Sequence, residues 1–323
     1  MTRGEKRKII LDALHNFPTL PIRTVARYIL AEYGPYFDGD LEKIRHAIRY
    51  YTGKEGEQNR ETIGNNVIKR DKVELPLTWR VQRKPHLLPA GRWLVLADVH
   101  VPYHEPKALI AAVEWGKARN CTHVLLNGDI QDCASVTHWP KTSRRNFDKE
   151  LVEFIQFLDW LGQELPLPTV YKPGNHEYWL PRYYASKAPE LIGVPLLAME
   201  SILNLEARGI EFLEYKQIVM AGKLPILHGD EPKFSSPVNA ARGLFLKTHS
   251  WAMCSHFHST SEHSTRDIHG TVMTTWSTGC LCDLNPDYAP YGNANWGFAI
   301  VDVHKDGSFN VDNRRILPNG EVV

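Results

Sequence analysis

This chain of 323 residues lacks the features that mark membrane proteins and secreted proteins. It contains no run of about 18 apolar residues, the length that a membrane-spanning helix requires. Its charged first eight residues, Met1 to Lys8, lead into an amphipathic stretch and not into a long apolar core with a cleavage site. We therefore expect no signal peptide and no membrane partner, and we expect a cytoplasmic protein.

Cysteine is also scarce. The chain has five cysteines, an odd number, at positions 121, 133, 254, 280 and 282. Their spacing matches neither a disulfide framework nor a zinc ribbon, so we expect reduced thiols. The pair Cys280 and Cys282 either approaches a functional site or simply packs in the core, and we favour packing.

Net charge is nearly absent, at +1, but it is unevenly distributed. Residues 1–92 hold 18 Lys and Arg against 11 Asp and Glu, whereas the remainder holds 20 against 26. The first part therefore carries +7 and the second −6. A charge asymmetry of this kind favours a separate basic module that meets a negatively charged partner.

Residues 1–53 predict a small all-α domain of three helices, loosely similar to a helix-turn-helix module. Apolar residues recur at helical spacing in three stretches, the second opened by Pro21 and closed by Gly34, the third closed by Gly53. The third helix places basic side chains opposite its apolar stripe, which predicts contacts with nucleic-acid phosphates. The candidate nucleic-acid-binding residues are Arg45, Arg49 and Lys54. A protein-binding role, or a merely solvated face, is the alternative.

Residues 54–90 are polar and then punctuated by Pro76, Pro85 and Pro89. This composition predicts a linker with some ordered contact to the domain that follows. The remaining domain, residues 91–323, alternates apolar runs with helical patterns at Glu105–Arg119 and Phe147–Leu161. The later stretch Gly270–Val311 favours strands, so the whole domain predicts an α/β fold.

Five short polar motifs follow apolar runs in this domain. They are Asp98-Val99-His100, Asn127-Gly128-Asp129, Gly174-Asn175-His176-Glu177, His228-Gly229-Asp230 and His256-Phe257-His258. Carboxylate, imidazole and amide groups together suit borderline-hard divalent ions such as Mn²⁺, Fe²⁺ or Zn²⁺. Apolar runs predict buried strands, and ligands in α/β sheets gather at the carboxyl ends of such strands. We therefore expect the motifs to converge on one crevice.

In residue type and order, these motifs resemble the calcineurin-like metallophosphoesterase superfamily over roughly residues 91 to 305. The resemblance implies a two-sheet α/β/β/α sandwich that binds two divalent metal ions. The first ion would be held by Asp98, His100, Asp129 and His258, and the second by Asp129, Asn175, His228 and His256. Asp129 would bridge the two ions, and His176 would be the catalytic imidazole. Ser255 stands where the family has Gly, and we expect only a modest backbone adjustment there.

Two ions roughly 3.5 to 4 Å apart hold the attacking and leaving oxygens of a displacement at phosphorus, with a bridging hydroxide as the nucleophile. His176 would then protonate the leaving group as the general acid. Glu177 and Asp132 are candidates for orienting ligand N–H groups, or they are ordinary surface carboxylates. Mn²⁺ is the favoured ion, and Fe, Zn and Mg are alternatives.

The substrate expected from this sequence is nucleic acid or a nucleotide, cleaved by a phosphodiesterase or nuclease reaction. The arginine of the G-D-x-V-D-R-G pattern in Ser/Thr protein phosphatases is missing after Asp129, which lowers the phosphoprotein interpretation. Arg144 and Arg145 either reach over the metals or form a solvated pair. Aromatic residues flanking the motifs, such as Tyr178, either stack on a base or pack as walls.

Two alternatives remain. One is a phosphomonoesterase acting on a small metabolite or phosphoprotein, and the other is a nucleic-acid-binding protein with a vestigial metal centre. The intact set of donors argues against the second. The segment from His228 to Cys280 also looks like that of phage-encoded members of the superfamily, which would place the protein in a host cytoplasm.

Overall fold

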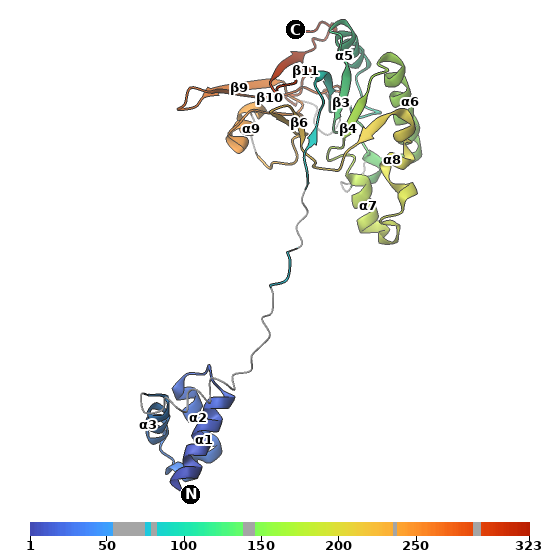
Figure 1. Cartoon of the computed structure of the whole chain (residues 1–323). Coiled ribbons are helices and arrows are strands. Elements are labelled where there is room, and N and C mark those ends of the chain that lie inside the picture. The colour runs from blue at the N-terminus through green and yellow to red at the C-terminus, as the bar shows by residue number, and fades with distance from the viewer. Residues whose placement is uncertain (54–74, 79–82, 138–145, 235–237, 287–291) are drawn as a thin grey trace. The chain divides into compact units, whose positions relative to one another are not determined.

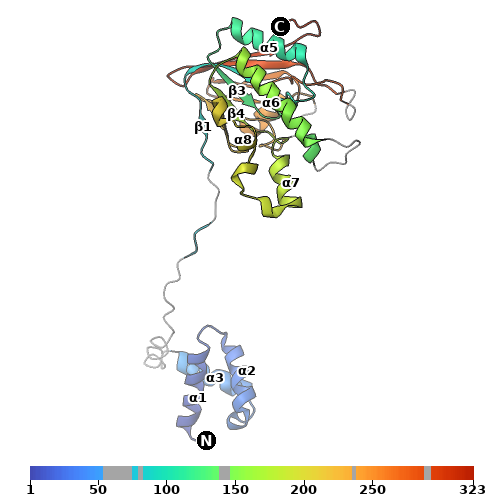
Figure 2. The same cartoon turned by 90° about the vertical axis from the view of Figure 1, so that its right-hand side faces the viewer.

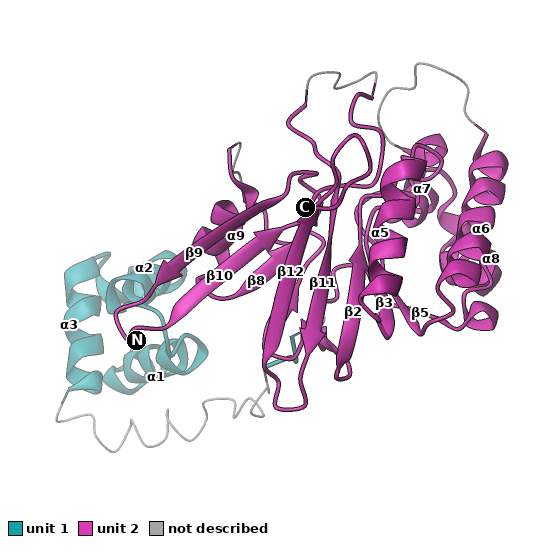
Figure 3. Ribbon diagram, turned by 90° about the horizontal axis from the view of Figure 1, so that it is seen from above, with its two compact units in different colours: residues 1–80 teal, residues 81–323 magenta. Residues whose placement is uncertain are grey.

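The computed structural model describes residues 1–53, 75–78, 83–137, 146–234, 238–286 and 292–323. It divides the chain into two compact units, Met1–Arg80 and Val81–Val323 (Figure 3). Most of the segment predicted as a linker, residues 54–90, lies outside the described residues. The end of this segment is described: it forms strand β1 (His86–Leu87), which pairs with strand β6 of the second unit.

The first unit packs three helices, α1 (Arg3–Asn16), α2 (Ile22–Tyr33) and α3 (Leu41–Thr52), with a short 3₁₀ helix η1 (Gly34–Phe37) between the last two (Figure 1). The Thr2 hydroxyl caps α1 and the Asp40 carboxylate caps α3, where each accepts otherwise unpaired backbone N–H groups. The predicted boundaries at Pro21, Gly34 and Gly53 are the caps of α2 and α3. A buried aliphatic cluster from all three helices forms the core of this unit.

The second unit is built on two mixed six-stranded sheets. The first sheet has the order β1, β6 (Val219–Ala221), β7 (Leu224–Ile226), β8 (Ala252–Cys254), β10 (Val272–Ser277) and β9 (Ser261–Arg266). The second has the order β12 (Phe309–Arg315), β11 (Gly297–Val303), β2 (Gly91–Leu96), β3 (His123–Asn127), β4 (Thr169–Lys172) and β5 (Ile210–Phe212). Strands β2 to β5 run parallel, so their carboxyl ends share one edge.

Helices complete the layers. They are α5 (Pro106–Ala118), α6 (Phe147–Glu164), α7 (Trp179–Lys187), α8 (Met199–Ile202) and α9 (Ala240–Thr248), with 3₁₀ turns η3 (Ala134–Val136), η4 (Pro189–Leu191), η5 (Pro195–Leu197) and η6 (Glu206–Arg208). Figure 2 shows α6 in front of β3 and β4, and α5 packs on β11 of the same sheet. Helix α9 packs on β8, β9 and β10 of the other sheet.

Alternation along β2 shows how the layers form. Trp93 and Val95 belong to the core between the sheets, whereas Leu94 and Leu96 belong to the core beneath the helices. Because successive side chains of a strand point to opposite faces, an all-apolar strand requires cover on both sides. The architecture is the predicted α/β/β/α sandwich.

The two long helices predicted in this unit are present as α5 and α6. Glu105 and Arg119 are the caps of α5 and not part of its body, and α6 continues to Glu164. The prediction did not include the helices α7 to α9. It also missed the strands β1, β5 and β6, because two or three residues carry too little periodicity. In the part of the chain that the structure describes, no helix is both long and apolar enough to cross a bilayer.

Candidate metal centre

The five motifs lie at the ends of strands from both sheets. Asp98 follows β2, Asn127 ends β3, Gly174 follows β4, His228 follows β7 and His256 follows β8. Backbone contacts join neighbouring ends within each sheet, as when the Asp98 N–H donates to Gly128 O at 3.1 Å and the Ser255 N–H donates to His228 O at 2.7 Å. Between the sheets, the Asn127 side-chain amide donates to Leu227 O at 2.8 Å. The structure therefore brings the predicted motifs together.

Backbone strain is concentrated at the candidate ligands. Five of them have positive φ: Asp98 (51°), His100 (51°), Asp129 (53°), His256 (68°) and His258 (54°). Residues with a Cβ rarely adopt this conformation, which costs roughly 1–3 kcal/mol at each position and collects at functional sites. The surrounding fold thus holds these side chains in orientations that an isolated loop would not select.

The first group of donors consists of Asp98, His100, Asp129 and His258. His258 Nε2 lies 3.5 Å from Asp98 Oδ1 and 3.2 Å from His100 Nε2. His100 Nε2 lies 4.0 Å from Asp129 Oδ2. Nitrogen and oxygen atoms thus face one small volume, as a coordination site requires.

The second group consists of Asp129, Asn175, His228 and His256. His228 Nε2 lies 3.2 Å from both Asp129 Oδ2 and Asn175 Oδ1. Its Nδ1 faces the Asn127 carbonyl oxygen at 2.9 Å, and an N–H there leaves the Nε2 lone pair for a ligand role. Single donor atoms of Asp129, His228 and His256 lie within 4.8 Å of one another. Asp129 Oδ2 thus faces both groups.

Unpaired atoms support a fit to divalent cations. Among the described residues, the buried atoms Asp98 Oδ1 and His256 Nδ1 have no hydrogen-bond partner. Buried polar atoms are costly unless something satisfies them. His100 Nε2 and His258 Nε2 also lie close together. If neither nitrogen carries a proton, their two lone pairs face each other, and only a cation between them would satisfy both. Cations bound by the two groups would satisfy all of these atoms.

Charges within the centre shift several pKa values. Burial raises the pKa of Asp129, but His228 and His176 outweigh it and hold the pKa well below the usual carboxyl range. Burial lowers the pKa of His176, but Asp129 and Asp132 raise it to about 9. Without metal ions, these charges favour an ionised Asp129 and a protonated His176.

Glu177 holds the motifs in register. Its carboxylate accepts backbone N–H groups of Asp129 (3.0 Å), Ile130 (2.7 Å), Gln131 (3.0 Å) and Gly174 (2.8 Å). It also accepts the Tyr171 hydroxyl at 2.8 Å. The sequence left Glu177 open between orienting ligand N–H groups and being an ordinary surface carboxylate. In the structure Glu177 is buried, and it organises the backbone that carries the candidate ligands.

Asp132 orients two imidazoles. Its Oδ1 lies 2.9 Å from His100 Nδ1 and 3.3 Å from His176 Nδ1, and its backbone oxygen lies 2.8 Å from His176 Nδ1. An N–H at Nδ1 of His100 directs its Nε2 toward the first group of donors. The predicted ligand sets do not include His176, whose Nε2 lies 3.9 Å from Asp129 Oδ2.

Glycine is required at two positions in the centre. A Cβ at Gly128 would lie 2.4 Å from His228 Nδ1, and a Cβ at Gly174 would lie 2.4 Å from Asp129 Oδ1. Gly128 also has a φ of 87°. The close approach of these two loops therefore excludes any side chain there.

Ser255 has a role beyond replacing the expected Gly. It is fully buried, and its Oγ accepts from Asn127 Nδ2 at 3.0 Å and from Thr278 Oγ1 at 2.9 Å. The backbone of the next residue is fixed by a hydrogen bond, in which the His256 N–H donates to Asp98 Oδ2 at 2.9 Å. The hydroxyl joins the ends of β3 and β8.

Sequence reasoning missed a buried ion pair between two ligand loops. Lys172, the last residue of β4, is fully buried, and its ammonium donates to Glu231. Glu231 also accepts the backbone N–H of His228 at 3.1 Å and that of Gly229 at 2.8 Å. A lysine that ends an otherwise apolar strand was the available signal.

We expect Lys172→Met to destabilise the protein by about 3–5 kcal/mol, because it leaves the buried Glu231 carboxylate without its partner. Adding Glu231→Gln should recover part of this loss. Urea unfolding measures both effects. Lys117→Met is the matched control, because Lys117 pairs with Glu114 and Glu164 at the surface, where such pairs contribute about 0–1 kcal/mol. Equal losses in the two lysine variants would contradict the prediction.

The cysteines are all free and buried. Cys280 and Cys282 are packed, as favoured, and they also approach the centre: Cys282 Sγ lies 3.9 Å from His258 Nδ1. The two open possibilities for this pair therefore hold together. These thiols fill the space behind a candidate ligand.

Other candidates lie elsewhere. Arg45 pairs with Glu42 and its side chain is only 23% exposed, whereas Arg49 is exposed on α3. Lys54, Arg144 and Arg145 lie outside the described residues. Of the flanking aromatic residues, Tyr178 stacks on Tyr215 with ring centroids 4.0 Å apart.

Comparison with known proteins gives a family match. A family model described as calcineurin-like phosphoesterase matches residues 91–270. Similar solved structures include a dimetal phosphatase from Danio rerio, with 13% identity over 70% of this chain and 96% of that chain and a TM-score of 0.38. Yfce, a phosphoesterase from E. coli, has 12% identity over 68% and 98% with a TM-score of 0.33. Vacuolar Protein Sorting 29 from Cryptosporidium parvum has 12% identity over 71% and 99% with a TM-score of 0.32. No curated protein matches the chain.

Proposed function

The chain belongs to the calcineurin-like phosphoesterase family, and we propose that it hydrolyses phosphodiester bonds in nucleic acid or nucleotides with two divalent ions, preferably Mn²⁺. The observation that carries this proposal is that donors from all five motifs gather around the Asp129 carboxylate. A vestigial centre would have lost at least one donor, and none of the seven is missing. The two ions would supply the positive charge that activates a water and stabilises the leaving oxygen.

His176 acts as the general acid in this proposal. It sits beside Asp129 without belonging to the ligand groups, and Asp132 fixes its ring through Nδ1. The proton available for a leaving alkoxide is therefore at Nε2, which faces the centre. Trp179 lies against the same ring, with centroids 3.9 Å apart, and restricts its rotation.

A basic cleft in the first unit supports nucleic acid as the partner. This cleft between α1 and α3, about 350 Å³ in volume, combines cationic and aromatic side chains. Its lining includes Arg3, Lys6, Arg7, Lys43, His46, Tyr50 and Tyr51. Cations beside exposed rings suit a phosphate backbone and its bases. Because Arg45 is already paired with Glu42, we favour this cleft over the outer face of α3 for phosphate contacts.

One panel of substrates tests the activity. Purified protein with Mn²⁺ is offered single-stranded DNA, duplex DNA, RNA, a bis-aryl phosphodiester and an aryl phosphomonoester. We expect hydrolysis of the diesters and of at least one polynucleotide. Turnover of the monoester with intact polynucleotides would instead favour a phosphomonoesterase.

Neutralising the cleft should weaken binding of polynucleotide. The triple variant Arg3→Gln, Lys6→Gln, Arg7→Gln is expected to bind polynucleotide more weakly. The slope of log affinity against log salt concentration should also become shallower, by roughly 0.7–0.9 for each phosphate that the protein no longer neutralises. Fluorescence anisotropy at several salt concentrations measures both quantities.

The matched control removes the same charge elsewhere in the first unit. It replaces the exposed residues Lys8, Arg23 and Arg27 with Gln. A second comparison, Arg45→Gln with Arg49→Gln, tests the face of α3. If the control triple weakens binding as much as the cleft triple, only general charge matters; unchanged binding in every variant would assign the unit to protein contacts.

A further inference from the structure

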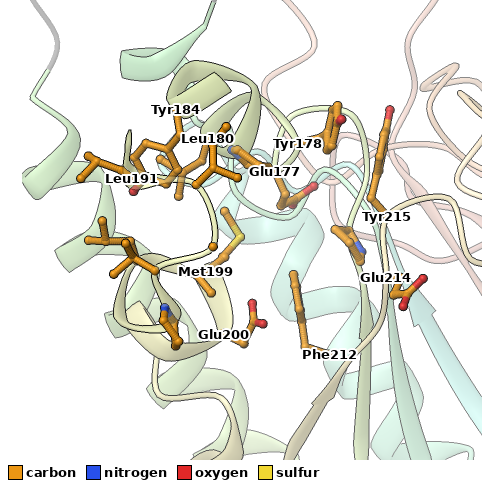
Figure 4. Close-up of a pocket in the computed structure, with 18 of the residues that line it drawn as sticks. Glu177, Tyr178, Leu180, Tyr184, Leu191, Met199, Glu200, Phe212, Glu214 and Tyr215 are labelled. Carbon is orange, nitrogen blue, oxygen red and sulfur yellow. The ribbon is translucent and has the colours of Figure 1, made fainter. Parts of the chain in front are cut away.

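An apolar pocket lies beside the candidate centre and takes no part in holding the metals. It has a volume of about 500 Å³ and is lined by residues of α7, η4, η5, α8 and β5 (Figure 4). In Figure 4, Tyr178 and Tyr215 lie on one side of it, and Leu191 and Tyr184 lie on the opposite side. This volume is within the range typical of small-molecule sites, roughly 300–1,000 Å³.

The pocket shares its walls with two ligand loops. Pro173, Glu177 and Tyr178 line it, and they flank the segment that carries Asn175 and His176. On the same side, the Tyr215 hydroxyl donates to Asp230, which follows His228 and Gly229. A group attached to a phosphate at the centre is therefore within reach of the pocket.

The chemistry of the lining selects an uncharged, flat group. Among the described residues, none of those lining the pocket is Lys, Arg or His, so the pocket itself offers no partner for a phosphate. Its walls are aliphatic and aromatic. Apart from Glu177, which binds the backbone of the centre, its charged lining residues are Glu200 and Glu214, and both are exposed. Carboxylates accept hydrogen bonds from amino and ring N–H groups of the kind that nucleobases carry.

The stacked rings supply a platform. Tyr178 and Tyr215 are nearly parallel, with 12° between their planes, and Tyr178 is 42% exposed. Their separation of 4.0 Å leaves no room for a ring between them, so a further ring extends the stack from outside. Stacking of a base on an aromatic side chain is tolerant of base identity.

We propose that this pocket binds the nucleobase next to the scissile phosphodiester. The proposal rests on the proposed function and names the part of the substrate that the chain recognises. A base can enter such a pocket only after it leaves the stack of a duplex. The preferred substrate is therefore a single-stranded or terminal nucleotide.

Two pairs of matched variants isolate the pocket. Tyr178→Ala removes the platform, and its control is Tyr183→Ala, a residue 40% exposed on α7 that does not line the pocket. Ile192→Asn places a polar group in the wall, and its control is Leu196→Asn. Ile192 and Leu196 are both exposed apolar residues of the same segment, and only Ile192 lines the pocket.

The kinetic experiment compares a dinucleoside monophosphate with its two analogues that each lack one base. For the wild type, loss of one particular base should lower kcat/KM by about tenfold or more, as stacking energies imply. The two pocket variants should lose this difference while hydrolysing that analogue at the wild-type rate. The two controls should keep it. Equal kcat/KM for all three compounds in the wild type would overturn the proposal.

A binding experiment separates failure of the pocket from failure of the proposed function. A dinucleoside monophosphate containing 2-aminopurine is titrated with protein in metal-free buffer. Quenching in the wild type and both controls, but not in the pocket variants, supports base binding whether or not any diester is hydrolysed. If such binding is seen but no diester of the substrate panel is hydrolysed, the proposed function is refuted and the proposed base pocket is not. Unquenched wild type, or equal quenching in every variant, refutes the pocket.

Discussion

Replacing Asp129 with Asn is expected to remove both metal ions and most of the activity. Asp129 Oδ2 faces His228 Nε2 at 3.2 Å and His100 Nε2 at 4.0 Å, so one carboxylate contributes its charge to both groups of donors. Substituting a residue that only orients a metal ligand lowers metal affinity or activity by about 10- to 100-fold. Substituting a ligand that both ions share should therefore lower activity by more than about 100-fold. Elemental analysis should show about two ions per chain in the wild type and fewer than one in the variant.

Asp132→Asn is the graded control for this experiment. Asp132 orients His100 and His176 without facing the metals directly, so an intermediate loss of about 10- to 100-fold is expected. Asp148→Asn, at the exposed start of α6, should change nothing. Circular dichroism checks that each variant is folded. A well-folded wild type with no more than one ion after metal supplementation would contradict a dinuclear centre.

Replacing His176 with Ala should lower the rate by about 10²- to 10⁴-fold while the metal content stays unchanged. The reason is that His176 lies beside Asp129 but outside the two groups of donors, with its Nδ1 held by Asp132. The loss should shrink for substrates with good leaving groups such as a nitrophenolate, because these need no proton. A series of aryl diesters with different leaving-group pKa values measures this dependence.

His304→Ala is the control for that series, because His304 is exposed in the turn after β11. It should leave both rate and metal content intact. A loss in His176→Ala that is equal across all leaving groups would argue against acid catalysis. A loss of metal ions would show that His176 is a ligand.

The convergence of the five motifs was predictable from the sequence. Each donor follows an apolar run, and the carboxyl ends of parallel strands meet at one edge, so strand position alone predicts convergence. The boundaries of α2 and the end of α3 were equally local, because Pro and Gly act on the backbone beside them. Glu105, which was predicted inside α5, is instead its N-cap. The same local rules did not detect β5 or β6, which are too short to show a period.

The groups that hold the centre together were not predictable in this way. Glu177 accepts backbone N–H groups from residues 46 to 48 positions earlier in the chain, and Lys172 pairs with Glu231, 59 positions later. No pattern of spacing distinguishes such a carboxylate from one on the surface. The positive φ angles of the candidate ligands likewise appear only after the two sheets have packed.

The sequence by itself determined the donor types, their order and the strands that present them, because these depend on side-chain chemistry and short-range periodicity. Only the tertiary structure decided which atoms face one another, which lysine is buried and where an apolar pocket opens beside the centre. Those features arise from segments far apart in the chain, whose side chains meet only when the two sheets and their helices close on a common core.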